Sequence, residues 1–346
     1  MYKWYALKRI LRGVVIYVIL IFLFSLLFNK VSEETTENMI FDQIQAEARG
    51  LKTTTAEEYL KWRQTRKAEL YHQYKLDRPF AERVVSNAIN IITFRFGTST
   101  IIKSGTGSQK VMDILMEALP RTILLFTLAA VFQTIIGLWL GLKKAQKPGG
   151  KLDKSTSIVT LILQGMPVWW VGLLFILFFS YTLKLFPSGG LSSVQRPEGF
   201  MFVIDRMWHM CLPIMTLVLL IFWSNSFVIR NLVVGTLQED FIMSARARGI
   251  PERKVLFGHT IRTAAPPIVT IIILRLIVSM SGSMIFEGIF SWPGLGNLYW
   301  ISVQQNDIPV LMGNLALTTG MYQIGLIFLD LIYGFLDPRV KVGGKA

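Results

Sequence analysis

Six stretches of this sequence are apolar over a length that suffices to cross a lipid bilayer, for which a helix needs about 20 residues. A chain in lipid must satisfy its backbone polar groups internally, and a helix does so. Only 17% of the 346 residues are charged, whereas soluble domains have about 25%. We therefore predict an all-α polytopic membrane protein with six transmembrane helices. The stretches are approximately 10–28, 119–142, 157–183, 210–229, 268–286 and 313–336.

The first apolar stretch has the outline of a signal peptide, with four basic residues at its start. They are Lys3, Lys8, Arg9 and Arg12. A secretory signal also needs a cleavage site with small residues, and none follows the segment LLFNK. We expect an uncleaved N-terminal helix.

Lysine and arginine are distributed unevenly among the segments between these stretches, and such a bias sets the orientation of a membrane protein. The loops at 143–156 and 230–267 hold five and six of them, and four lie near the N-terminus. The loops at 184–209 and 287–312 hold three and none. We therefore expect both termini and the two basic loops to be cytoplasmic. The segment 29–118 then lies outside, because long segments translocate largely regardless of charge.

The net charge of +14 has two interpretations, nucleic-acid binding and contact with anionic lipid. Nucleic-acid binding would gather the positive charge in one folded domain. Here the basic residues of every short loop follow a rule of membrane topology instead. We expect membrane lipid, and no nucleic acid, as a partner.

The sequence has no motif that would support catalysis in this chain. A phosphate-binding loop needs Gly-Lys-Ser/Thr, but Gly150-Lys151 is followed by Leu152. The patterns HExxH and GxSxG and paired carboxylates are absent as well. The single cysteine, Cys211, allows neither an internal disulfide nor a zinc cluster. We expect no catalytic residue, no cofactor site and no metal site.

The basic loop between the fourth and fifth apolar stretches contains the segment DFIMSARARGIPERK. Its pattern predicts a helix that ends near Arg248, where a glycine follows. The apolar face of this helix would hold Leu237, Phe241 and Ala245, with Ile242 alongside. Pro251 suits the first turn of a second helix.

Two further prolines, Pro266 and Pro267, would close the loop before the next span. A helix, a glycine turn and a second helix suit a surface that docks into a groove on another protein. The alternative is a basic loop that lies on anionic lipid. The shape alone leaves both interpretations open.

Several quoted stretches resemble the permease subunits of binding-protein-dependent ABC importers. SARARG at 244–249, followed by IPERKVLFGHTIRTAAPPIV, resembles the cytoplasmic signature loop of that family. FSWPGLG at 290–296, DIPVLMG after it, DLIYGFLDPRV at 330–340 and LPRTILL at 119–125 agree, as do LDRPF and FGTS in the outer segment. The resemblance covers nearly the whole chain and is greatest to the dipeptide/oligopeptide/nickel group.

The resemblance implies a type I ABC importer permease fold with both termini cytoplasmic. Its parts would be an N-terminal transmembrane helix at 1–28, an extracytoplasmic segment at 29–109, a transmembrane core domain at 110–336 and a cytoplasmic tail at 337–346. The loop 230–267 would couple the chain to ATPases. The expected coupling residues are Met243, Ser244, Ala245, Arg246, Ala247, Arg248, Gly249 and Ile250.

The resemblance also implies partners and a cargo. The chain would form half of a translocation pathway in the plasma (cytoplasmic) membrane, and a homologous second permease subunit would complete it. Two ATPase subunits would bind ATP and Mg²⁺, and an extracytoplasmic solute-binding protein would deliver the solute. Di- or oligopeptides are the expected cargo, with nickel chelates and oligosaccharides as alternatives.

Two features depart from the family pattern. That pattern begins Glu-Ala-Ala, but Met243 and Ser244 stand at the glutamate and first alanine positions. A contact from Arg246 or Arg248 could replace that of the missing glutamate. The outer segment, especially about 30–70, also looks longer than is usual in the group, and its role is open.

A secondary transporter or an ion channel is the alternative function, and such proteins work through ionisable residues inside the membrane. Arg275 and Asp330 are the only charged residues well inside the apolar stretches. At a rise of about 1.5 Å per residue, both lie roughly 10 Å from the cytoplasmic side. We predict that they form an ion pair between the fifth and sixth spans. In the alternative, Arg275 extends to the headgroups and Asp330 meets water.

The loop at 287–312 is rich in aromatic and turn residues. It would either place Trp292 and Trp300 at the level of the lipid headgroups, or help to gate the outer mouth or meet the solute-binding protein. The residues singled out in it are Trp292, Pro293, Gly294 and Gly296.

Overall fold

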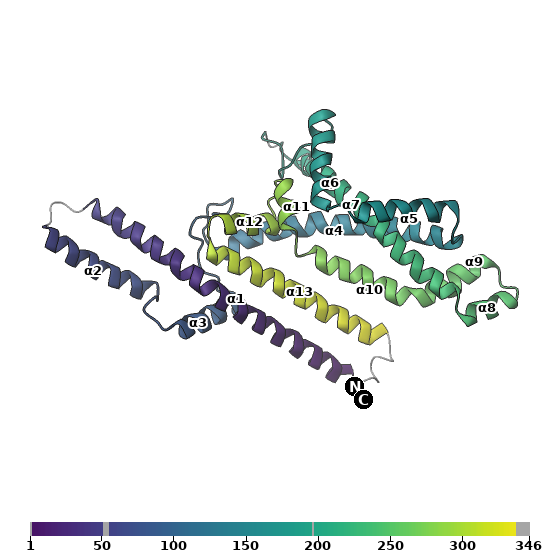
Figure 1. Cartoon of the computed structure of the whole chain (residues 1–346), viewed down its shortest axis with the longest axis horizontal. Coiled ribbons are helices and arrows are strands. Elements are labelled where there is room, and N and C mark those ends of the chain that lie inside the picture. The colour runs from purple at the N-terminus through teal and green to yellow at the C-terminus, as the bar shows by residue number, and fades with distance from the viewer. Residues whose placement is uncertain (1, 51–54, 196, 337–346) are drawn as a thin grey trace. The chain divides into compact units, whose positions relative to one another are not determined.

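The computed structural model describes residues 2–50, 55–195 and 197–336, and the predicted tail at 337–346 lies outside them. Helices joined by loops make up the described residues (Figure 1). Two segments are π-helical, η1 (Ile176–Thr182) and η2 (Val255–Thr260). The α-helices are α1 (Tyr2–Ala48), α2 (Ala56–Gln73), α3 (Phe80–Ile92), α4 (Val111–Gln146), α5 (Lys151–Gln164), α6 (Val168–Phe175), α7 (Phe200–Leu237), α8 (Asp240–Ala247), α9 (Glu252–Lys254), α10 (Ile261–Ser279), α11 (Met284–Ile289), α12 (Leu295–Gln304) and α13 (Ile308–Leu336).

Among the described residues, five helices are long and apolar enough to cross a membrane. They lie in α1, α4, α7, the run Glu252–Ser279 and α13. A sixth candidate is the pair formed by α5 and by α6 with η1, which meet at an angle of 95°. The third predicted span, 157–183, is therefore broken. Pro167 at the start of α6 explains the break, because proline lacks a backbone N–H and disfavours helical geometry in the residue before it.

The fifth predicted span begins earlier than expected, because Pro266 and Pro267 lie inside α10 and do not close the preceding loop. Prolines are tolerated in membrane helices where π-turns and threonine side chains satisfy the carbonyls left without a donor. Each proline removes the donor for the carbonyl four residues before it, which lies at Arg262 or Thr263, and the π-helix η2 immediately precedes this part of α10. The helix ends at Ser279, three residues before the left-handed Gly282 (φ +71°).

The described residues divide into two compact units, one of which comprises Arg12–Met116 and Ile301–Gly320. In this unit α1 continues to Ala48, well beyond the predicted end at 28, because the chain has no glycine or proline between Gly13 and Gly50. α2 lies beside this extension (Figure 1). Their shared core is formed by Ile40, Ile44 and Leu70.

Thr55 and Glu58 stand at the spacing that predicts a capping box, and the start of α2 confirms it. The Thr55 side chain accepts the Glu58 backbone N–H, and the Glu58 carboxylate accepts the Thr55 N–H, which satisfies two of the donors that a helix start leaves unpaired. α3 follows, and its buried face consists of Val84, Ala88 and Ile91. These helices belong to the segment predicted to be extracytoplasmic.

The other unit comprises the described residues of Met1–Leu11, Glu117–Trp300 and Met321–Ala346. Its helices α4 and α7 approach closely at Gly137 and Gly141, which form a Gly-x-x-x-Gly pattern. A methyl group on Gly137 would lie 2.6 Å from Asn225 Cβ, and one on Gly141 would lie 2.9 Å from Ile229 Cβ. Small residues at this spacing allow two helix backbones to pack in direct contact. The loops at the ends of α4 and α7 are therefore attached to a closely packed pair of helices.

Candidate functional site

The loop that follows α7 holds the short helix α8, which is closed by a glycine. Gly249 has φ +76°, a left-handed conformation that other L-residues adopt at an energetic cost. Its N–H donates to the Arg246 carbonyl, and the Ile250 N–H donates to the Ala245 carbonyl. These two bonds form a Schellman motif. The predicted helix with a glycine stop is confirmed.

α8 packs on its own unit through a narrow apolar face. Ile242 and Ala245 are fully buried, and Leu237 of α7 belongs to the same core cluster. Phe241, which we expected on this face, is exposed. Residues 238–239 belong to neither α7 nor α8 and interrupt the helix. The buried face of α7 therefore does not continue through Phe241. The outward side of α8 is exposed and consists of Met243, Ser244, Arg246 and Ala247.

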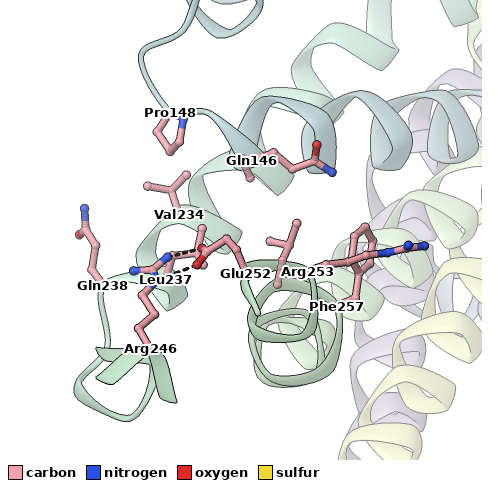
Figure 2. Close-up of a pocket in the computed structure, with 11 residues that line it drawn as sticks. Gln146, Pro148, Val234, Leu237, Gln238, Arg246, Glu252, Arg253 and Phe257 are labelled. Atoms are coloured by element: carbon pink, nitrogen blue, oxygen red, sulfur yellow. Dashed lines mark hydrogen bonds and ion pairs between the residues drawn. The ribbon is translucent and has the colours of Figure 1, made fainter. Parts of the chain in front are cut away.

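Arg246 binds within the loop itself. Its Nε and Nη2 atoms donate to the two carboxylate oxygens of Glu252 at 3.1 and 2.6 Å. This bidentate ion pair joins α8 to the start of α9 across the turn at Gly249 (Figure 2). Arg248 is exposed. Of the two arginines considered as substitutes for the missing glutamate, Arg248 is the one without a carboxylate neighbour among the described residues.

A cavity of about 560 Å³ lies beside the loop. Figure 2 shows that its walls come from the ends of α4 and α7 on one side and from α8, α9 and η2 on the other. The lining residues are Ala145, Gln146, Pro148, Val234, Leu237, Gln238, Arg246, Glu252, Arg253, Leu256 and Phe257. An exposed helix beside a groove of this size has the shape of a docking surface.

The base of this region is fixed by an ion pair between α5 and α7. Asp153 is buried and accepts Arg230 Nη2 at 2.6 Å and Arg230 Nε at 3.1 Å. The same carboxylate accepts the Gly149 N–H at 2.9 Å, which ties down the loop between α4 and α5. The end of α7 that leads to α8 is therefore held in place from a second helix.

A second cluster joins two of the motifs noted in the sequence, LPRTILL in α4 and FSWPGLG before α12. Trp292 is buried, and its Nε1 donates to the Arg121 carbonyl at 3.1 Å. Arg121 Nη1 donates in return to the Pro293 carbonyl at 3.3 Å. Trp292 is only 1% exposed and packs inside the protein, whereas Trp300 is 42% exposed. The burial of Trp292 disfavours a direct contact of its side chain with lipid headgroups.

Glu287 lies at the centre of this second cluster and is fully buried. Its carboxylate accepts the Thr122 hydroxyl and the Asn297 N–H, both at 3.0 Å. It thereby caps the start of α12, where backbone donors have no partner within the helix. Gly294 is required here, because a methyl group on it would clash with Thr122 Oγ1 and Glu287. Glu287 was not predicted from the sequence, although an acidic residue in a loop without lysine or arginine was a signal for it.

The predicted ion pair between Arg275 and Asp330 is not formed. Asp330 instead binds Arg9 of α1, with 3.1 Å between Oδ2 and Nη1. The sequence position of Asp330 indicates how deep it lies in the membrane, but it does not show which basic residue lies opposite. Among the described residues, no carboxylate lies within 4.0 Å of Arg275.

Comparisons with known proteins bear on what this arrangement does. The family described as the binding-protein-dependent transport system inner membrane component matches residues 133–342. This chain belongs to that family. The matched residues include α8, the glycine turn and the loop before α12. The membrane helices and the family membership together make the chain a multi-pass protein of the plasma membrane.

Three relatives of this family member extend the similarity toward the N-terminus. An oligopeptide transport system permease protein of Bacillus subtilis is 31% identical over 80% of this chain and 86% of its own. A peptidoglycan transport system permease protein of Agrobacterium fabrum is 31% identical over 79% of this chain and 75% of its own. A dipeptide transport system permease protein of Escherichia coli is 29% identical over 80% of this chain and 85% of its own.

Proposed function

We propose that this chain is the permease subunit of an ATP-driven importer of di- or oligopeptides. The observation that carries the proposal is the similarity, over most of both chains, to permease proteins of oligopeptide and dipeptide transport systems. The exposed helix α8, held by a glycine turn beside a groove, supports it. Such a subunit needs a contact that transmits the work of a separate ATPase.

The chain supplies one half of the translocation pathway, and a homologous second permease subunit supplies the other. Both termini and the loop 230–267 lie in the cytoplasm, and 29–109 lies outside. Six spans result if α5 and α6 with η1 count as one broken span. The core domain is 110–336, in the arrangement of a type I ABC importer.

Coupling runs from α8 into the spans. Two partner ATPase subunits bind ATP and Mg²⁺, and their closure moves α8, whose outward residues meet the ATPase surface. The buried residues Ile242 and Ala245 transmit this movement to α7 and η2, since all of them share one core cluster. The chain itself hydrolyses nothing, and an extracytoplasmic solute-binding protein delivers the peptide.

The test is reconstitution of the chain with its second permease, ATPases and solute-binding protein in proteoliposomes. We expect peptide-loaded binding protein to stimulate ATP hydrolysis several-fold, roughly the effect of 1 kcal/mol on a barrier, and labelled tripeptide to accumulate only with ATP. Uptake that follows an ion gradient without ATP would instead identify a secondary transporter. Ion conductance without uptake would identify a channel.

A further inference from the structure

A second cavity, of about 470 Å³, lies among the membrane-spanning helices of the larger unit. α4, α7 and α10 form its walls, and the turn after α10 closes one end. Most of the lining is apolar, including Phe126, Leu217, Ile221 and Leu274. Four lining residues have polar side chains. The Ser279 hydroxyl donates to the Leu276 carbonyl and the Ser283 hydroxyl accepts the Phe286 N–H, whereas Arg275 is cationic and Gln133 is an amide.

Neither Arg275 nor Gln133 has a side-chain hydrogen bond or ion pair within the described part of the chain. Arg275 forms no ion pair there, and Asp330, its predicted partner, binds Arg9 instead. Gln133 is 94% buried, given its exposure of 6%, and no hydrogen bond of its side-chain amide to another described residue is formed. A guanidinium keeps its proton under all physiological conditions, and a charge inside a membrane protein that lacks a partner marks a pathway for a ligand or an ion.

We propose that this cavity is a binding site on the translocation pathway for the C-terminal carboxylate of a peptide in transit. The proposal rests on the proposed function. Arg275 donates two parallel hydrogen bonds to the carboxylate, the bidentate geometry that a guanidinium favours. The Gln133 amide donates a third hydrogen bond. The apolar walls accommodate peptide side chains of different shapes.

The chemistry of the cargo explains why the charged group would be placed here. A transporter of many peptides can recognise only what all of them share, and the terminal carboxylate is common to every unmodified peptide. The apolar side chains around Arg275 make few directional contacts, so they exclude few sequences. An anion in the cavity also offsets the desolvation of Arg275.

The test compares a tripeptide with its C-terminal amide in the reconstituted complex, using wild type, Arg275→Gln and Arg275→Lys. The ratio of wild-type to variant uptake is taken for each peptide, so that selection by the binding protein cancels. For Arg275→Gln we expect about tenfold loss with the free acid and less than about twofold with the amide, as for the loss of one charge-assisted contact. Arg275→Lys keeps the charge and should retain part of the preference.

Controls separate the possible failures. Arg206→Gln changes an exposed arginine on α7 and should affect neither peptide. If Arg275→Gln does not assemble, Gln133→Leu provides the test, with an expected loss of about threefold for the acid alone, for one neutral hydrogen bond. Equal losses for acid and amide would overturn the inference and would indicate that Arg275 pairs with another subunit. No uptake of either peptide by wild type would overturn the proposed function itself.

Discussion

Replacement of Gly249 by valine is expected to lower ATP-dependent peptide uptake at least about tenfold. A loss of about 1.4 kcal/mol in the free energy that couples the ATPase to the permease corresponds to a factor of ten. Gly249 adopts φ +76°, and a methyl group there would have no atom within 4 Å. The penalty is therefore backbone strain, on the order of 1–2 kcal/mol for an L-residue and more for a β-branched one. The strain opens the Schellman turn and displaces α8 from the surface it meets. The measurement is uptake together with substrate-stimulated ATP hydrolysis in proteoliposomes.

Two matched variants show whether the effect belongs to this turn. Gly199→Val imposes a strain at least as large, because Gly199 has a positive φ (+60°) with ψ −135°, outside the left-handed region that L-residues can adopt. Gly199 also has open space around it, but it lies at the other end of α7. This variant should leave coupling near the wild-type level. Gly249→Asn should retain most activity, since asparagine tolerates the left-handed region. Normal uptake and hydrolysis in Gly249→Val would show that the turn has no part in coupling.

Glu287→Ala is expected to destabilise the purified complex by about 3 kcal/mol or more, the sum of several buried groups left without partners. The Thr122 hydroxyl and the Asn297 N–H lose their acceptor, and the start of α12 loses its cap. The measurement is thermal unfolding in detergent, with Glu198→Ala as the control, because Glu198 is exposed. A melting temperature within a degree of the control would contradict the assigned role of Glu287.

The same site predicts a dependence on pH. Burial raises the pKa of Glu287 to about 7 from its ordinary value of 4.5. A raised pKa means that the folded chain holds the proton more tightly than the unfolded chain does. The stability from this site is therefore complete below about pH 4.5 and is lost as the pH rises through about 7. Glu287→Gln cannot ionise and should flatten this part of the stability profile, whereas an unchanged profile would assign it to other groups.

Local signals in the sequence sufficed for the turn and cap features of this protein. The Thr55 capping box and the glycine stop at Gly249 depend on residues within four positions, so a single segment contains all the information. The orientation of α8 could not be obtained in the same way. It depends on the break at 238–239, and the burial of Ile242 rather than Phe241 follows from packing on α7 and η2.

Contacts between distant segments account for what the sequence did not reveal. Asp330 pairs with Arg9, which lies at the opposite end of the chain. The expected depth of Asp330 in the membrane could not show whether Arg9 or Arg275 is its partner. One partner of Glu287, Thr122, comes from α4, so the burial of Glu287 was not visible in its own loop. The Gly-x-x-x-Gly pattern at Gly137 and Gly141, in contrast, was visible and would have predicted the close packing of α4.

The central claim is that α8 is the part of the chain that meets the ATPase, and site-specific cross-linking tests it most directly. The chain has one cysteine, Cys211, so Cys211→Ala gives a background without reactive thiols. A cysteine introduced at the exposed Arg248 is expected to cross-link to the ATPase subunit in the assembled complex, with a yield that changes between ATP-bound and nucleotide-free states. A cysteine at Val194, exposed in the loop before α7, should not cross-link to it. Equal or absent cross-linking from the two positions, in a complex that still transports, would contradict the account.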